Sequence, residues 1–373
     1  MKKDPFKNYT KQSEPSKQKK ANYWKTAIGL QAVDGLQVSD YLIEKAILNI
    51  EGYLTIEEVS QLIHDYYIQN PKTDFENRDE EADKVSTRIA ELISNKTFDF
   101  STQEYLFIHK YLFQDIYEHA GQIRTYNITK KEWILDEDSV TYGNSLRLLE
   151  SLEYDIFEER KFNYQNFSKD QIIDHLSFFI SNLWQNHVFC EGNTRTTAVF
   201  FIKYLNVLGY DVTNDLFEKN SWYFRNALVR ANYTNLKKGI VKTNIFLEKF
   251  LRNLLFGETN ELNNRAMHIK FDLKQAKKPD IDIKKPDIDT KKPDIDSQVE
   301  LINLKIPEIT LNQIRLIYNH LGLKTVFGRS DIQNLTGVKS SRASDIIKTM
   351  LDHKIIYPVR GYGKGKYIFY ELI

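Results

Sequence analysis

The stretch that decides the fold runs His187-Val-Phe-Cys-Glu-Gly-Asn-Thr-Arg195. It joins two apolar segments of the chain. Residues 168–186 carry apolar side chains three and four positions apart, and Ser168 with Gln171 forms a capping box, so this segment is predicted to be a buried helix. A second apolar segment, from about residue 196 to residue 208, ends before Gly209 and predicts another helix. The nine residues between them are therefore expected to form a loop joining two helices.

The composition of this loop indicates a phosphate site. Residues 192–194 would lie at the start of the second helix, where unpaired N–H groups and the positive end of the helix dipole attract an anion. Arg195 would add a guanidinium to that site. Glu191 is a hard oxygen ligand of the kind that holds Mg²⁺ against phosphate oxygens. His187 is expected to transfer a proton, because a neutral imidazole can accept one from an attacking hydroxyl.

The loop resembles the HxFx[DE]GNxR signature of the Fic (Fido) family, whose specified positions are matched here by His187, Phe189, Glu191, Gly192, Asn193 and Arg195. The resemblance covers residues 100–255. It implies a helical bundle with a short β-hairpin flap, expected at residues 128–142, which aligns the target segment. It also implies transfer of AMP from ATP to a Ser, Thr or Tyr hydroxyl of a target protein, with Mg²⁺ as cofactor. His187 would be the general base, Glu191 the metal ligand, and Gly192, Asn193 and Arg195 the phosphate contacts.

Two positions depart from the pattern of many AMP-transferring members, which read GNGR followed after two residues by a second arginine. Thr194 replaces the last glycine, and Ala198 stands at the place of the second arginine. The Thr194 hydroxyl is expected to replace a nucleotide contact. The Doc branch also replaces this glycine and transfers phosphate, so a Doc-like protein kinase, or transfer of another nucleotide, is an alternative. An inactive nucleotide-sensing regulator that binds DNA is the alternative from another class.

The resemblance also suggests an inhibitory residue and two base contacts. Fic enzymes are often restrained by a glutamate, within [ST]xxxE[GN], that enters the nucleotide site. Glu51 keeps the Glu-Gly end of this motif and is the favoured autoinhibitory residue, with Glu91 as the second candidate. Phe224 and Asn226 lie where the family holds the nucleotide base, although aromatic residues at helical spacing are more often part of a core.

Composition divides the chain into five segments within a mainly α fold. Residues 1–22 are polar and rich in lysine, which predicts a mobile leader. Residues 23–95 are expected to be helical, and the resemblance to antitoxins fused to some Fic proteins implies a regulatory segment there. The Fic catalytic domain is expected at residues 96–256. Residues 257–300 predict a charged linker, in which KKPDID occurs three times, and residues 301–373 form the last unit.

The last unit is basic. Residues 301–373 contain eleven Lys or Arg and five Asp or Glu, a net charge of +6. Three expected helices and a glycine-turned hairpin resemble a winged helix. Arg342 and Lys348 on the third helix, and Lys364 in the wing, would contact DNA phosphates, with protein binding as the alternative.

The totals narrow the class of protein further. The 373 residues carry 52 basic and 51 acidic side chains, which argues against a chain that binds polyanions over its whole surface. A single cysteine excludes an intramolecular disulfide framework, and no apolar run approaches the length of a membrane span. These totals favour a cytoplasmic protein. Together with the resemblance to the Fic family, we expect a bacterial enzyme, whose target protein and oligomeric state the sequence leaves open.

Overall fold

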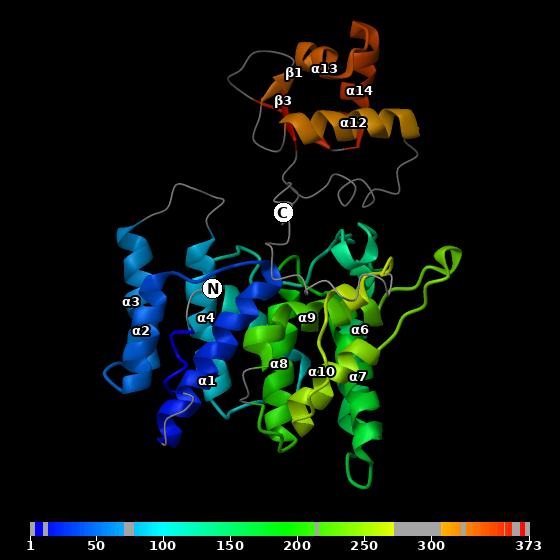
Figure 1. Ribbon diagram of the computed structural model, residues 1–373. Coiled ribbons are helices and arrows are strands. Elements are labelled where there is room, and N and C mark those ends of the chain that lie inside the picture. Colours follow the sequence, from blue (N-terminus) through cyan, green and yellow to red (C-terminus); the bar gives the residue numbers. More distant parts are fainter. Residues whose placement is uncertain are drawn as a thin grey trace. The chain divides into compact units, whose positions relative to one another are not determined.

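The structure is a computed structural model that describes residues 4–9, 14–70, 78–212, 216–271, 307–321, 326–353, 355–359 and 366–369. It divides into two compact units, one that carries the helices from α1 to η6 and one that carries the elements from α12 to β3 (Figure 1). Within the described ranges, no helix is both long enough and apolar enough to cross a membrane.

The first unit begins with α1 (Pro15–Gly29), the 3-10 segment η2 (Leu30–Asp34), α2 (Asp40–Glu51), α3 (Ile56–Gln69) and α4 (Asp79–Ser94). The prediction of a mobile leader over residues 1–22 is wrong from Pro15 onward, because α1 begins there. The side chains of Phe6 and Ala21 are also buried. The segment has buried apolar residues among its lysines, and a prediction from composition alone does not detect them.

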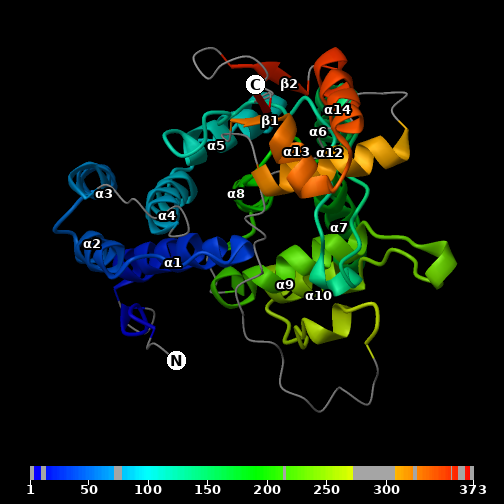
Figure 2. The same ribbon diagram turned by 90° about the horizontal axis from the view of Figure 1, so that it is seen from above.

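Six longer helices build the rest of the first unit: α5 (Thr102–Phe113), α6 (Leu148–Lys161), α7 (Lys169–Asn186), α8 (Asn193–Val207), α9 (Leu216–Ala231) and α10 (Ile245–Phe256). Helix α8 is central, since every residue from Asn193 to Leu205 is buried and the helix contacts α4, α5, α7 and η2. Figures 1 and 2 both show α2 and α3 on the opposite side of the unit from α6 and α7. The two helices predicted on either side of the nine-residue loop are confirmed as α7 and α8.

The segment predicted to be a hairpin flap is irregular. It contains the 3-10 turn η3 (Trp133–Leu135) and one isolated antiparallel bridge between Glu132 and Asp138, so the regular hairpin expected at residues 128–142 is not formed. Asp136 and Glu137 adopt left-handed backbone angles, with φ of 57° and 66°, inside the turn that this bridge closes. We call residues 128–142 the flap.

Three 3-10 turns complete the first unit: η4 (Ser145–Arg147), η5 (Leu236–Lys238) and η6 (Arg265–Met267). The last of them lies inside the predicted linker, which is therefore wrong for its first part. Met267 is fully buried, and the Ile269 N–H donates to the Ile134 carbonyl at 2.9 Å. Residues 257–271 thus pack on the first unit, whereas the three KKPDID repeats lie outside the described residues.

The second unit contains α12 (Glu308–Leu321), β1 (Phe327–Gly328), α13 (Arg329–Thr336), α14 (Ser340–Asp352), β2 (Ile356–Pro358) and β3 (Lys366–Phe369). The strands form an antiparallel sheet in the order β1-β3-β2, with Phe327 opposite Tyr367 and Tyr357 opposite Ile368. A small core that includes Ile317, Ile346 and Phe369 joins the helices to this sheet. The three predicted helices and two predicted strands are confirmed, and β1 was missed because two residues give no periodicity.

Candidate active site

His187 ends helix α7 and turns the chain into the loop. It is the C-cap residue and adopts a left-handed conformation, with φ of 47° and ψ of 54°. Its side chain is 4% exposed, its ring centroid lies 4.2 Å from that of Tyr142, and its Nδ1 lies 3.3 Å from the Trp184 carbonyl oxygen. The imidazole is therefore enclosed by the flap on one side and by the last turn of α7 on the other.

Arg124 fixes the backbone on which His187 sits. Its guanidinium donates to the carbonyl oxygens of His187 at 2.7 Å, Gly143 at 2.5 Å and Asn186 at 3.3 Å. Its own N–H donates to the Val188 carbonyl at 2.9 Å. A buried arginine thus satisfies the carbonyl groups that a helix leaves unpaired at its C-terminal end, and it ties α7 to the start of the flap.

The environment of His187 keeps its imidazole neutral. Burial, and then the positive charges of Lys130 and Arg124, hold the pKa of His187 well below 6.5. If the ring proton lies on Nδ1, which faces the Trp184 carbonyl, then Nε2 carries the free lone pair. The arrangement suits a group that accepts a proton near pH 7.

Asn193 closes the loop after His187. Its side-chain oxygen accepts from the Phe189 N–H at 2.9 Å, and its side-chain nitrogen donates to the Phe189 carbonyl at 2.7 Å. Both functional atoms of the amide are occupied by this clasp. The structure therefore gives the Asn193 side chain a role in shaping the loop, and only its backbone N–H is left for a phosphate.

His109 supports the loop from α5. Its ring stacks on Phe189 with centroids 3.6 Å apart, its Nδ1 accepts from the Gly121 N–H at 2.8 Å, and its Nε2 lies 3.0 Å from the Glu191 carbonyl oxygen. Since Nδ1 accepts, Nε2 carries the proton and donates to that carbonyl. Burial lowers the pKa of His109 to about 3, so this histidine is neutral and structural. No motif pointed to it.

Gly192 begins helix α8 in a conformation that favours glycine. Its φ is 72°, and a Cβ there would lie 2.3 Å from the Phe113 ring. The first helical hydrogen bond runs from the Thr196 N–H to the Gly192 carbonyl at 3.0 Å. The N–H groups of residues 193–195 precede this bond, which is the arrangement that attracts an anion at a helix N-terminus.

Thr194 points inward. Its hydroxyl accepts from the Trp184 indole N–H at 3.0 Å, and the Trp184 ring in turn packs edge-on against His187 with centroids 5.1 Å apart. The expectation that the hydroxyl replaces a nucleotide contact is not supported by this geometry. Thr194 instead acts through Trp184 on the position of His187.

Arg195 is fully buried and paired with acidic residues of the N-terminal segments. Its Nε lies 2.8 Å from a carboxylate oxygen of Asp34 at the end of η2, and its Nη2 lies 2.7 Å from Glu81 in α4. Burial opposes ionisation of both carboxyls, but the charge of Arg195 prevails and their pKa values are lowered. Sequence reasoning missed both carboxylates, since neither lies in a motif.

The two carboxylates differ in how firmly they are held. Glu81 also accepts from Arg78 at 2.8 and 2.7 Å and from the Tyr117 hydroxyl at 2.7 Å. The Asp34 contact is close, yet neither Asp34 Oδ2 nor Arg195 Nε makes an aligned hydrogen bond in it. Glu81 is thus a fixed counter-ion of Arg195, whereas Asp34 is the one that an incoming anion could displace.

Glu191 faces outward beside the loop. Its side chain is 52% exposed, and its Oε2 pairs with Lys130 of the flap, whose Nζ lies 3.5 Å away. Among the residues that the structure describes, no group of three or more His, Cys, Asp or Glu could hold a metal by itself. A single accessible carboxylate fits Mg²⁺, which usually takes one or two protein ligands and completes its shell with phosphate oxygens and water.

A buried ion pair ties the flap to helix α9. Glu132 is 1% exposed and accepts from Arg225 at 2.7 and 3.0 Å, and the Tyr142 hydroxyl lies 3.3 Å from the same carboxylate. Tyr142 is the residue that packs on His187. This ion pair is thus one of the contacts that position the flap beside His187.

The two predicted base contacts lie in the core of the unit. Phe224 is fully buried and packs on Phe217 and Phe250, with centroids 5.2 and 5.1 Å away. The Asn226 amide donates to the Asn264 side chain at 2.9 Å. Their environment does not support a nucleotide contact, because packing and this hydrogen bond already occupy both side chains.

The predicted inhibitory residues lie apart from the loop contacts. Glu51 pairs with Lys17 of α1 at 2.8 Å, and Glu91 hydrogen-bonds to Tyr111 of α5. The carboxylates that contact Arg195 are Asp34 and Glu81 instead. In this conformation the described residues therefore offer no contact that would support autoinhibition by Glu51.

The three residues predicted to contact DNA have different surroundings in the structure. Arg342 donates to Thr310 at 2.7 Å and to Gln313 at 3.1 Å, so it joins α14 to α12 within the unit. Lys348 is exposed on α14, and Lys364 lies outside the described residues. Among the three, the structure leaves Lys348 available to a partner.

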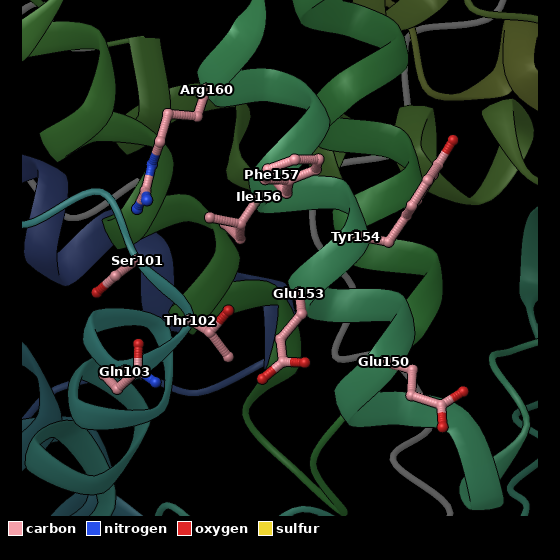
Figure 3. Close-up of a pocket in the computed structure, with 9 residues that line it drawn as sticks. All are labelled: Ser101, Thr102, Gln103, Glu150, Glu153, Tyr154, Ile156, Phe157 and Arg160. Carbon is pink, nitrogen blue, oxygen red and sulfur yellow. The ribbon is translucent and has the colours of Figure 1, made fainter.

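A pocket of about 530 Å³ lies apart from the loop, between the start of α5 and one face of α6. Figure 3 shows Arg160 reaching from α6 toward the Ser101 side of this pocket, with Glu150 and Glu153 along the same helix. Its lining includes no residue of the loop from His187 to Arg195. We therefore assign the chemistry to the loop.

Comparison with known proteins agrees with this assignment. The Fic/DOC family matches residues 99–205, which include the whole loop. Over 146 residues the chain is 27% identical to the probable protein adenylyltransferase y4lH of Sinorhizobium fredii, a match that spans 39% of this chain and 71% of that protein. Over 176 residues it is 26% identical to the protein adenylyltransferase VbhT of Bartonella schoenbuchensis, spanning 46% of this chain and 34% of that protein. Residues 99–205 are therefore a Fic/DOC family domain.

Proposed function

We propose that this chain is a protein adenylyltransferase that moves AMP from ATP to a Ser, Thr or Tyr hydroxyl of a target protein. The observation that carries the proposal is a neutral, enclosed His187 held beside the unpaired N–H groups at the start of α8. The names of the two similar adenylyltransferases support the same reaction class.

The proposed reaction uses His187 as general base. The oxygen of the target hydroxyl attacks the α-phosphorus of ATP, and its proton passes to Nε2 of His187. A new P–O bond forms to the target while the bond to pyrophosphate breaks. The N–H groups of residues 193–195 donate to the phosphate oxygens on which negative charge increases. No covalent bond to the enzyme is needed.

Glu191 is the residue that would hold Mg²⁺. When bound, the ion would supply positive charge against the phosphate oxygens of ATP. The accessible carboxylate of Glu191, and its position next to Asn193 and the start of α8, support this role.

The test follows the two phosphates of ATP separately. We would incubate the wild-type chain and the His187→Ala variant with Mg²⁺ and with ATP labelled at either the α- or the γ-phosphate, and measure label on protein. Transfer of the α-label that is lost in His187→Ala is the expected result. Transfer of the γ-label alone would replace the proposal with the Doc-like kinase. Absence of transfer with ATP, GTP and CTP, with cell lysate as target, would favour the inactive sensor.

We also propose that the second unit binds DNA in the manner of a winged helix. The support is the exposed face of α14, which includes Ser341 and Lys348, in a basic unit with the strand order β1-β3-β2. Duplex DNA should be retained at low salt and released as salt rises, because phosphate contacts displace counterions. Lack of retention at low salt would favour protein binding as the function of this unit.

A further inference from the structure

Among the residues that the structure describes, the positively charged side chains around the loop are held in short contacts with other protein groups, with one exception. Arg124 donates to carbonyl oxygens, Arg195 is paired with Asp34 and Glu81, and Arg225 is paired with Glu132. These contacts are 2.7 or 2.8 Å long. The carboxylates of Asp34 and Glu81 balance the charge of Arg195, and Glu132 balances that of Arg225, so these two cations attract an incoming triphosphate weakly. The guanidinium of Arg124 is already occupied by carbonyl oxygens.

Helix α8 does not supply another positive charge near its start. Residues 196–198 are Thr, Thr and Ala, and all three are fully buried. The lysine further along, Lys203, donates to the carbonyl oxygens of Leu92 and Asn95 at 2.7 and 2.9 Å. The charge that meets the outer phosphates of a nucleotide must therefore come from another element.

Lys130 on the flap is the exception. Its contact with Glu191, at 3.5 Å, is longer than the ion pairs of Arg195 and Arg225, and its side chain is 30% exposed. Its ammonium lies beside Glu191, and its charge contributes to the lowered pKa of both His187 and Asp34. A flexible lysine stem can move from one of these groups to a phosphate without a change of the backbone.

The backbone under Lys130 is held by contacts within the flap. The Lys130 N–H donates to the Ser139 hydroxyl at 3.1 Å, and the bridge between Glu132 and Asp138 closes the flap immediately after it. Glu132 is anchored in turn to Arg225 of α9. The flap therefore presents Lys130 at a constant place beside the loop.

We infer that Lys130 is a nucleotide-binding residue of this site, which contacts the β- or γ-phosphate of a nucleoside triphosphate. The inference rests on the proposed function, because it assumes that the loop binds a nucleotide. In the absence of nucleotide Lys130 neutralises Glu191. Once Glu191 binds a metal ion, the ammonium is released toward the phosphates.

Nucleotide affinity tests this directly and needs no target protein. Isothermal titration calorimetry would compare ATP, ADP and AMP, each with Mg²⁺, on the wild-type chain and on Lys130→Ala, Lys130→Arg and Lys131→Ala. Lys131 is the matched control, since it is the adjacent lysine and is exposed. Loss of one charge-assisted contact should weaken ATP binding by about tenfold in Lys130→Ala. AMP binding should change by less than about twofold, and Lys130→Arg and Lys131→Ala should bind ATP like the wild type.

Two results would overturn the inference: unchanged ATP affinity in Lys130→Ala, or an equal loss for ATP and AMP. Melting temperatures of the four proteins would verify that each is folded. If the wild-type chain bound ATP and transferred its α-label while Lys130→Ala bound ATP equally well, only this inference would fail. If the wild-type chain bound none of the three nucleotides, the proposed function would fail with it.

Discussion

Asp34→Asn should weaken the ion pairing of Arg195 with its carboxylate partners and strengthen nucleotide binding. The substitution keeps the size and shape of the side chain and removes one of the two negative charges that pair with Arg195. A phosphate that approaches the start of α8 competes with Asp34 for the same guanidinium. In the Asp34→Asn variant that competition is weaker, so affinity for ATP with Mg²⁺ should rise.

The structure indicates how much stability Asp34→Asn should lose without nucleotide and how much ATP binding should restore. Arg195 is fully buried and Asp34 is 25% exposed, and removing one partner of a buried ion pair costs about 3–5 kcal/mol. Glu81 remains 2.7 Å from Arg195, so we expect a smaller loss of stability without nucleotide, about 1–3 kcal/mol. In a unit of this size that lowers the melting temperature by roughly 2–10 °C. A tenfold gain in ATP affinity would return about 1.4 kcal/mol at saturation.

The assay is thermal unfolding at pH 7 with and without ATP and Mg²⁺. The control is Glu44→Gln, which removes the same charge from a surface ion pair with Lys45. Asp34→Asn should melt below the wild type without nucleotide and gain more degrees from ATP than the wild type gains. An equal or smaller gain from ATP in Asp34→Asn would refute the reasoning.

The pH dependence of the Asp34 effect has a definite sign. Nearby arginines and Lys130 outweigh burial and lower the pKa of Asp34 below 3.8. A carboxyl whose pKa is lower in the folded state stabilises the fold above its unfolded pKa and loses that contribution as the pH falls through the folded value. The stability difference between wild type and Asp34→Asn should therefore be fully present at pH 7, begin to shrink near pH 3.8 and disappear only below the lowered pKa of Asp34 in the folded state.

Three further predictions concern separate parts of the chain. Gly192→Ala should destabilise the first unit by about 2–4 kcal/mol in urea unfolding, because a Cβ would lie 2.3 Å from Phe113 at a φ of 72°. Since burial, Lys130 and Arg124 depress the pKa of His187, the rate of α-label transfer should stay level as the pH falls from 8 to 6, and a loss centred near pH 6.5 would contradict the neutral imidazole. Lys348→Ala should weaken retention on duplex DNA and reduce its salt dependence, measured by elution from immobilised DNA.

Local sequence signals predicted the loop and its two helices. The apolar spacing of residues 168–186 and the capping box of Ser168 and Gln171 appear in the structure as helix α7. The position of Gly192 at the start of α8 was also predicted, whereas its left-handed conformation was not. Each of these features depends on residues that are close in sequence, so local sequence patterns are sufficient to predict them.

The partners of Arg195 could not be predicted in this way. Glu81 lies 114 residues before Arg195, and neither it nor Asp34 belongs to a pattern that distinguishes it from other acidic residues on a helix or turn. The same limit explains Phe224, because periodicity shows that an aromatic side chain is on a helix face but not whether that face meets a ligand or the core. Long-range pairing decides these roles, and only the fold shows it.

Some motif residues hold the conformation of the loop, and others present groups that could act on a substrate. Gly192 permits the turn, Asn193 clasps Phe189, and Thr194 braces Trp184 against the ring of His187. Each of these residues is occupied by a contact within the protein. Apart from Arg195, which a phosphate would reach only by competing with Asp34, the motif groups left for a substrate are the imidazole of His187, the carboxylate of Glu191 and the backbone N–H groups of residues 193–195. Because backbone groups do not depend on side-chain identity, threonine in place of glycine at position 194 is compatible with the proposed anion site, and we expect nucleotide specificity to be set from outside the loop.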